Sequence, residues 1–253
     1  MPNRSQTVEI APNLPGYMAE PAGPGPAPGV LLFMEAYGVN DYIESEVRRL
    51  AGLGYAAIAP DFFRGETFAY SDGARAMARV VSLSDDELLA DVRATIAFLD
   101  RHPGVRHDRY GAVGFCMGGR LAFLTAAACA AKIGAAVAFY GGHIAPDQAR
   151  MGRKVIVDRA PDVQAPLLFF YGADDGSITP SEHARVAHAL SEAKKAYTLT
   201  VFPGAGHGFA SRDRTDYRPA AAEAAWADAA AFFGRLIREP REGCSRGSRG
   251  DGD

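Results

Sequence analysis

The sequence predicts an α/β fold, with a mostly parallel, doubly wound sheet flanked by helices on both faces. Short apolar runs alternate with longer amphipathic stretches along the chain, which is the order of strands joined by crossover helices. The 253 residues are 48% hydrophobic, enough to bury one substantial core. We therefore expect a single domain over residues 1–238. Residues 239–253 are polar and rich in glycine and charge, so they are expected to be a disordered tail.

The first expected elements are two short strands, Thr7–Ala11 and Tyr17–Pro21, which form a hairpin at the edge of the sheet. The Pro- and Gly-rich residues 21–29 follow as a rigid surface loop, too short to link two domains. Apolar runs bounded by turn residues then predict parallel strands. These strands are Val30–Met34, Ala56–Ala59, Tyr110–Phe115, Ala135–Tyr140, Leu167–Tyr171 and Thr198–Phe202.

Helices are expected between the parallel strands. Asp85–Asp100 shows the pattern best, since acids fill its first turn and apolar residues recur at helical spacing. Residues 120–131 are also helix-like, and Pro219–Ile237 predicts a final helix whose Trp226 packs on the sheet. Residues 62–83 are expected to form a cap or lid over the functional site.

A cysteine stands between the predicted strand Tyr110–Phe115 and the helix after it, in the run Gly-Phe-Cys-Met-Gly-Gly at 114–119. This is the arrangement of a nucleophile elbow, with a thiol in place of the usual serine. Glycines let the backbone take a strained turn that pushes the central side chain out above the sheet. The amides at the start of the helix favour a thiolate and can bind an oxyanion. Cys116 is therefore predicted to be the nucleophile of an acyl-transfer reaction.

The other two cysteines have simpler interpretations. Cys129 lies in an alanine-rich helical stretch and is expected to pack against the sheet, whereas Cys244 lies in the polar tail. The absence of a CxxC pair argues against a disulfide framework, a zinc site or a redox pair. The glycines around Cys116 do not form a phosphate-binding loop, because no Lys followed by Ser or Thr comes after them. No metal or cofactor is expected.

An acid and a histidine follow the cysteine in the order of an α/β-hydrolase triad. His207 stands in a glycine-rich loop at 204–209, after the last predicted strand. Between the two, the strand Leu167–Tyr171 ends in the run Gly-Ala-Asp-Asp-Gly. We expect Asp175 to orient the histidine, with Asp174 as the alternative and the other acid capping the turn or the next helix.

Glu35 directly follows the apolar strand Val30–Met34. A carboxyl group at the end of a buried strand is unfavourable unless it is paired or protonated. Glu35 is therefore either a functional acid, or part of an ordinary ion pair or a solvated strand end. The backbone amide of Ala36 is the expected second oxyanion donor, beside that of Met117.

With Val-Leu-Leu-Phe-Met-Glu-Ala-Tyr-Gly at 30–38 and Gly-Tyr-Ala-Ala-Ile-Ala-Pro-Asp at 54–61, these motifs make residues 7–237 resemble the dienelactone hydrolase family. The resemblance implies an α/β-hydrolase fold and a Cys-His-Asp enzyme that opens dienelactone or a related ester through an acyl-thioester. It also implies that Glu35 contacts the resting cysteine and takes part in activating it when substrate arrives. The alternatives are a broader carboxylesterase or thioesterase, and a binding protein that has lost turnover.

The resemblance is weaker for substrate binding. Family members that act on dienelactone hold its carboxylate with arginines, one of which lies a few residues after the catalytic histidine. Here Ser211 falls at that position and Arg212 one place later, so Arg212 is the expected carboxylate ligand. A second arginine could come from Arg75 or Arg79. The other candidate pocket residues are Tyr37, Tyr70 and Phe209.

The net charge of −3 indicates no particular partner and argues against nucleic acid, which usually requires a basic face. No apolar run is long enough to span a bilayer, and the polar N-terminus does not resemble a signal peptide. We expect a cytoplasmic enzyme, a monomer or a small homo-oligomer, that acts on a small-molecule lactone or ester.

Overall fold

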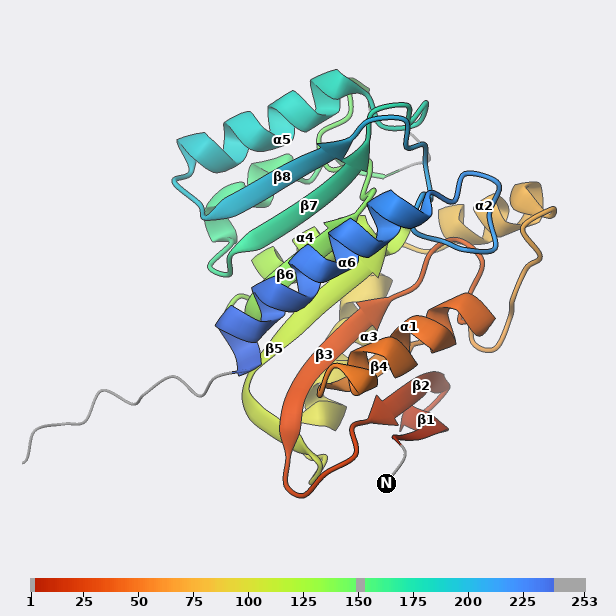
Figure 1. Ribbon diagram of the computed structural model, residues 1–253, viewed down its shortest axis with the longest axis vertical. Coiled ribbons are helices and arrows are strands. Elements are labelled where there is room, and N and C mark those ends of the chain that lie inside the picture. Colours follow the sequence, from red (N-terminus) through yellow and green to blue (C-terminus); the bar gives the residue numbers. More distant parts are fainter. Residues whose placement is uncertain (1–2, 149–152, 239–253) are drawn as a thin grey trace, which may run out of the picture.

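The computed structural model describes residues 3–148 and 153–238. Within them, eight strands form one sheet in the order β1-β2-β4-β3-β5-β6-β7-β8 (Figure 1). β2 is antiparallel to β1 and β4, and the pairings from β4 to β8 are all parallel. The predicted edge hairpin is β1 with β2. The strands are β1 (Arg4–Ala11), β2 (Leu14–Glu20), β3 (Ala27–Phe33), β4 (Ala56–Pro60), β5 (Val105–Phe115), β6 (Ile133–Phe139), β7 (Leu167–Gly172) and β8 (Tyr197–Phe202).

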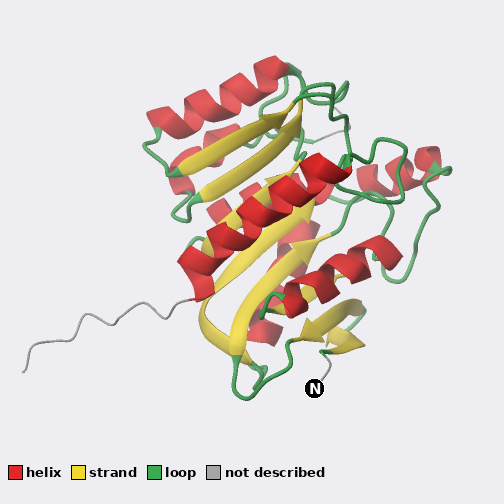
Figure 2. Ribbon diagram, in the orientation of Figure 1, coloured by secondary structure: helices red, strands yellow, loops and turns green. Residues whose placement is uncertain are grey.

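Helices cover both faces of this sheet. α1 and α6 cross the face turned toward the viewer, and α3 and α4 lie behind it (Figures 1 and 2). The predicted α/β fold with a mostly parallel sheet is therefore confirmed. The helices are α1 (Asp41–Gly52), α2 (Gly73–Val81), α3 (Asp85–Leu99), α4 (Met117–Ala128), α5 (Pro180–Glu192) and α6 (Pro219–Phe233), with a 3-10 segment at Val157–Asp162 and a π-helical turn at Gly234–Arg238.

α3 shows how local sequence sets a helix boundary. The Ser84 side chain accepts the backbone N–H of Glu87, and the Glu87 carboxylate accepts the backbone N–H of Ser84. This reciprocal capping box satisfies amides that have no partner inside the helix. Leu88, Val92 and Ile96 then fall on the buried face, as the helical spacing predicts.

Several strands begin earlier than the sequence pattern predicts, and β5 and β3 show why. β5 begins at Val105 rather than Tyr110, and β3 begins at Ala27 inside the Pro- and Gly-rich stretch. Ala27 and Val105 are register partners, and the Ala27 amide donates to the Gly104 carbonyl at 2.9 Å. Residues 106–109 of β5 are partly or fully exposed, so this part of the strand has no continuous apolar run from which it could be predicted.

Residues 62–83 contain α2 and two loops. Figure 1 shows α2 standing off the sheet, beyond the carboxyl ends of the parallel strands. Met77 and Val80 of α2 line the same cavity as Cys116, so this segment covers the site as a cap. None of the described helices is long and apolar enough to cross a membrane.

Candidate active site

Cys116 occupies the sharp turn between β5 and α4. Its backbone has φ 54° and ψ −116°, a conformation that residues with side chains rarely adopt and that stores strain. A Cβ on Gly114 would collide with the Gly118 backbone, and a Cβ on Gly118 with the Phe33 carbonyl, so both positions require glycine. The turn holds the thiol at the N-terminus of α4, where the amide dipoles favour a thiolate.

His207 approaches from the loop after β8. Its Nδ1 lies 2.8 Å from Asp175 Oδ2, and because a carboxylate only accepts, Nδ1 is the donor. Asp175 Oδ1 accepts the amides of Ser177 and Ile178 at 2.8 and 3.2 Å, which fix the carboxylate in this orientation. Asp174 is exposed. The structure therefore brings Asp175, and not Asp174, against the histidine.

The charges of these residues suit a protonated histidine opposite a thiolate. Burial lowers the pKa of His207, but the negative charge of Cys116 and the hydrogen bonds to Asp175 and Cys116 outweigh it and raise that pKa to about 10. Burial likewise raises the pKa of Asp175, but His207 and the two backbone amides outweigh it and lower that pKa overall. The arrangement can hold a thiolate–imidazolium pair, the reactive form of a cysteine nucleophile.

Aromatic rings support the histidine. Tyr140 meets the ring of His207 edge-on at 5.3 Å between centroids, and it packs on Phe209 at the same distance. Phe209 is completely buried and does not line the cavity, which differs from the expectation that it contacts substrate. The chain turns back into the core after Gly208, whose φ is 83°, and this turn places Phe209 beneath Tyr140.

Glu35 is completely buried at the end of β3, which excludes the solvated strand end. The Tyr70 hydroxyl donates to Glu35 Oε1 at 2.7 Å, and Arg214 Nη1 lies 3.8 Å from Oε2. Burial raises the pKa of this carboxyl, against the lowering effects of Tyr70, Arg214 and His207. The acid is thus paired, and its partners are on the cap and on the loop that carries the histidine.

A cavity of about 420 Å³ opens at the thiol. Met117 lies in the first turn of α4, where backbone amides have no acceptor within the helix. Ala36 follows β3 on another wall of the cavity, so the two amides can serve together as oxyanion donors. Tyr37 also lines the cavity. The rest of the lining is Met77, Val80, Cys116, Arg120, Gly142, His143, Arg153, Gly176, Ser177, Ile178, His207 and Arg214.

Of the arginines that follow the histidine, the one at the cavity is not the one the sequence suggested. Arg212 is exposed and donates to the Ser45 hydroxyl, outside the cavity. Arg214 lines the cavity instead, with its guanidinium 5.7 Å from the centroid of the Tyr37 ring. Two successive turns follow the histidine. They place Arg214 at the cavity and Arg212 outside it.

The two arginines considered on the cap do not reach the cavity either. Arg75 pairs with Asp72 at 3.0 Å, and Arg79 pairs with Glu66 at 3.4 Å. Both pairs lie on α2 or its flanking loops, so these guanidiniums stabilise the cap rather than face the thiol.

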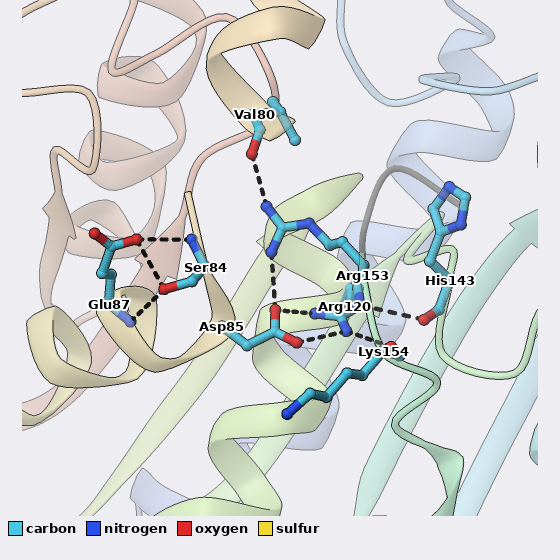
Figure 3. A network of polar contacts seen from close by, with 8 residues as sticks. All are labelled: Val80, Ser84, Asp85, Glu87, Arg120, His143, Arg153 and Lys154. Atoms are coloured by element: carbon cyan, nitrogen blue, oxygen red, sulfur yellow. Dashed lines mark hydrogen bonds and ion pairs between the residues drawn. The ribbon is translucent and has the colours of Figure 1, made fainter. Parts of the chain in front are cut away.

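The structure also reveals a charged network that the sequence did not suggest (Figure 3). Arg120, one turn after the nucleophile, makes two hydrogen bonds to Asp85 at 2.6 and 2.9 Å. Arg153 donates to the same carboxylate and to the Val80 carbonyl, both at 2.8 Å. One aspartate thus joins the nucleophile helix to the end of the cap. The only feature of the sequence that could have indicated this network is Arg120, a charged residue in the otherwise apolar helix α4.

In the described part of the chain, no cluster of three or more His, Cys, Asp or Glu side chains could hold a metal ion. Cys129 is partly buried, and its burial raises the pKa of the thiol. Cys244 and the expected tail at 239–253 lie outside the described residues.

Comparisons with known proteins identify relatives of this chain. The sequence profile of the dienelactone hydrolase family matches residues 14–237. A protein of Methylorubrum extorquens, provisionally named carboxymethylenebutenolidase, is 36% identical over 84% of this chain and 74% of its own length. A Bradyrhizobium protein, provisionally named 2-oxo-3-(5-oxofuran-2-ylidene)propanoate lactonase, is 34% identical over 83% of this chain and 84% of its own length.

Solved structures show the same architecture. A protein of Klebsiella pneumoniae, provisionally described as a dienelactone hydrolase, has a TM-score of 0.85 and 34% identity, over 92% of this chain and 99% of that one. The dienelactone hydrolase of Anabaena variabilis has a TM-score of 0.69 over 94% of this chain and 100% of that one. At 21% identity, the second likeness shows the fold alone.

Proposed function

This chain belongs to the dienelactone hydrolase family, a family of hydrolases that act on esters and lactones, and we propose that it opens an enol-lactone through Cys116, His207 and Asp175. One observation carries the proposal: His207, hydrogen-bonded to the buried Asp175, lies beside a cysteine on a strained elbow at the wall of a cavity. A nucleophile, a base and an orienting acid in contact are what covalent acyl transfer requires.

In the first step, Cys116 gives its proton to Glu35 and, as a thiolate, attacks the lactone carbonyl and forms a carbon–sulfur bond. The amides of Met117 and Ala36 donate to the oxyanion of the tetrahedral intermediate. Collapse of this intermediate breaks the ring carbon–oxygen bond and leaves an acyl-thioester. The released enolate takes the proton of the His207 imidazolium. An enolate is a good leaving group, which suits sulfur because a thiolate is itself easily expelled.

In the second step, water cleaves the thioester. Neutral His207, oriented through Nδ1 by Asp175, removes a proton from the water as it attacks the carbonyl. Collapse of the second tetrahedral intermediate expels the thiolate and releases the acid. His207 is then protonated again, and the expelled thiolate takes back the proton from Glu35, which restores the resting enzyme.

Arg214 replaces Arg212 as the proposed ligand of a substrate carboxylate. It lines the cavity, and its present acidic neighbour is Glu35. A substrate carboxylate would compete with Glu35 for the same guanidinium. Glu35 would then lose part of its charge compensation and become a better acceptor for the Cys116 proton, in line with the activation that the family resemblance implies.

A broader carboxylesterase or thioesterase activity is the second candidate. The observation that favours it is the apolar part of the cavity lining, Met77, Val80 and Ile178, which can accept a substrate without a carboxylate. The same two steps apply, with an alkoxide or a thiolate as the leaving group. We further propose that the enzyme works in the cytoplasm on small molecules, as a monomer or a small homo-oligomer.

The deciding experiment follows dienelactone ring opening by ultraviolet absorbance, with Cys116→Ala as the control. We expect turnover by the natural protein and a loss of at least a thousandfold in the variant. The lactone named for the Bradyrhizobium relative is the second substrate, because it too is a lactone that carries a carboxylate. If the folded enzyme hydrolyses neither lactone but does hydrolyse neutral esters or thioesters, the carboxylesterase or thioesterase activity replaces the lactonase activity as the proposed function.

A further inference from the structure

The carboxylate of Glu35 depends on one side-chain hydroxyl. Tyr70 donates to Oε1 at 2.7 Å, whereas Oε2 has no hydrogen-bond partner among the described residues. The nearest cation, Arg214, is 3.8 Å from Oε2 and makes no hydrogen bond to it. A completely buried carboxylate is strongly dependent on its few donors, so Tyr70 is the main local support of the charged form.

The Tyr70 side chain is held from three sides. Its hydroxyl lies 3.0 Å from Ser211 Oγ, on the loop that carries the histidine, and Asn40 Nδ2 donates to it at 3.5 Å. Its ring packs on Tyr37 at 4.5 Å, and the Arg214 guanidinium lies 5.9 Å from its centroid. Tyr70 itself is on the cap segment and does not line the cavity at the thiol.

From this geometry we propose that Tyr70 is a positioning residue: its hydroxyl holds Glu35 ionised and correctly oriented at the junction of the cap and the histidine loop. The inference rests on the proposed function, in which Glu35 accepts a proton from Cys116. Tyr70 touches neither the substrate nor the thiol. It acts through Glu35, and it makes the charge of that acid depend on the contact between the cap and the end of β3.

Other groups around Glu35 influence its titration and must stay constant in any test. They are Arg214, Asp213 and His207 on the loop after β8, Tyr37 after β3, Tyr42 on α1 and Tyr140 at the end of β6. Tyr70→Phe changes none of them, and it keeps the ring that packs on Tyr37. The variant therefore removes only the hydrogen bonds of one hydroxyl, those to Glu35, Ser211 and Asn40.

The test measures the titration of Glu35 by NMR of side-chain carboxyl carbons, in full-length protein labelled at glutamate and assigned with Glu35→Gln. Because the hydroxyl stabilises the carboxylate, Tyr70→Phe should raise the Glu35 midpoint by about one pH unit. The matched control is Tyr197→Phe, which removes a hydroxyl that bonds Ser191 and the Ala187 carbonyl at the other end of β8. The control should leave the midpoint unchanged.

A double-mutant cycle of Tyr70→Phe and Glu35→Gln, followed by kcat, distinguishes a positioning role of Tyr70 from a merely structural one. Tyr70→Phe should move the acid limb of the kcat profile upward by about the same pH interval, about one unit, with KM little changed because Tyr70 does not line the cavity. In the Glu35→Gln background the same substitution should have no further effect on kcat. An unchanged Glu35 midpoint, or an equal loss of activity with Gln at position 35, would overturn the inference. A shifted midpoint in a protein that hydrolyses no ester would instead refute the proposed function.

Discussion

At the residue scale, the orientation of His207 depends on a single carboxylate. Asp175 is buried and bonded to the imidazole, whereas its neighbour Asp174 points to solvent. Asp175→Asn keeps the shape but replaces an acceptor-only group, so the histidine can take the wrong tautomer. We expect kcat to fall by about a thousandfold to ten-thousandfold in Asp175→Asn.

The matched variant is Asp174→Asn, one residue away on the same turn. It should keep kcat within about a factor of two of the natural enzyme, because surface substitutions of this kind have small effects. The measurement is the steady-state rate on dienelactone or on the ester that proves to be hydrolysed. Equal survival of both variants would remove Asp175 from the proposed triad.

The sequence predicted these residues unevenly, for a physical reason. Cys116 and the Asp175–His207 pair follow directly from strands, whose carboxyl ends must meet at one edge of a parallel sheet. Arg214 and Tyr70 lie on irregular loops, where one additional turn changes which of two neighbouring side chains faces the site. The Ser211 amide donates to the Gly208 carbonyl and the Arg214 amide to the Ser211 carbonyl, and these turns cannot be inferred from residue spacing.

At the scale of elements, the Asp85 network connects the cap to the nucleophile helix. Asp85 is the first residue of α3, and it receives hydrogen bonds from Arg120 of α4 and from Arg153. Both guanidiniums are nearly inaccessible, with side chains 4% and 7% exposed. Asp85→Asn would leave two positive charges buried together, and we expect it to lower the free energy of unfolding by about 3 kcal/mol. Urea unfolding with a tryptophan fluorescence readout measures this change.

Asp86→Asn is the control for that measurement, since Asp86 is exposed in the same first turn of α3. Its loss should change the unfolding free energy by no more than about 0.5 kcal/mol. If the two variants are equally stable, the network is not a structural link. The boundaries of α3 were predictable because its cap and its apolar spacing are local, whereas the partners of Asp85 come from distant segments and were not.

At the scale of the whole molecule, stability depends on the balance between acids that folding makes stronger and acids that it makes weaker. The pKa values of Asp85 and Asp175 are lowered in the folded state, chiefly because cationic and hydrogen-bonding partners outweigh the raising effect of burial. Their contribution is complete above the unfolded pKa of aspartate and is lost as the pH falls through the folded values. Glu46 behaves in the opposite way, because burial raises its pKa to about 7.

The structure explains why Glu46 lacks compensation. Its nearest cation, Arg49, is 3.9 Å away and pairs more closely with Glu223, at 2.6 Å. Glu46 Oε2 has no hydrogen-bond partner among the described residues. Between the unfolded pKa near 4.5 and the folded value near 7, the folded state therefore binds more protons than the unfolded state. Stability from this group is complete below that interval and declines as the pH rises through it.

Glu46→Gln removes this titration, so the difference in unfolding free energy between variant and natural protein should grow with pH from 4.5 to 7 and then level off. At pH 8 this difference, the unfolding free energy of the variant minus that of the natural protein, should exceed its value at pH 4.5 by about 3 kcal/mol. Urea unfolding across this range provides the measurement. Glu44→Gln, on the partly exposed side of the same helix, should not reproduce the trend. A constant difference for Glu46→Gln would mean that solvent reaches this carboxylate in solution.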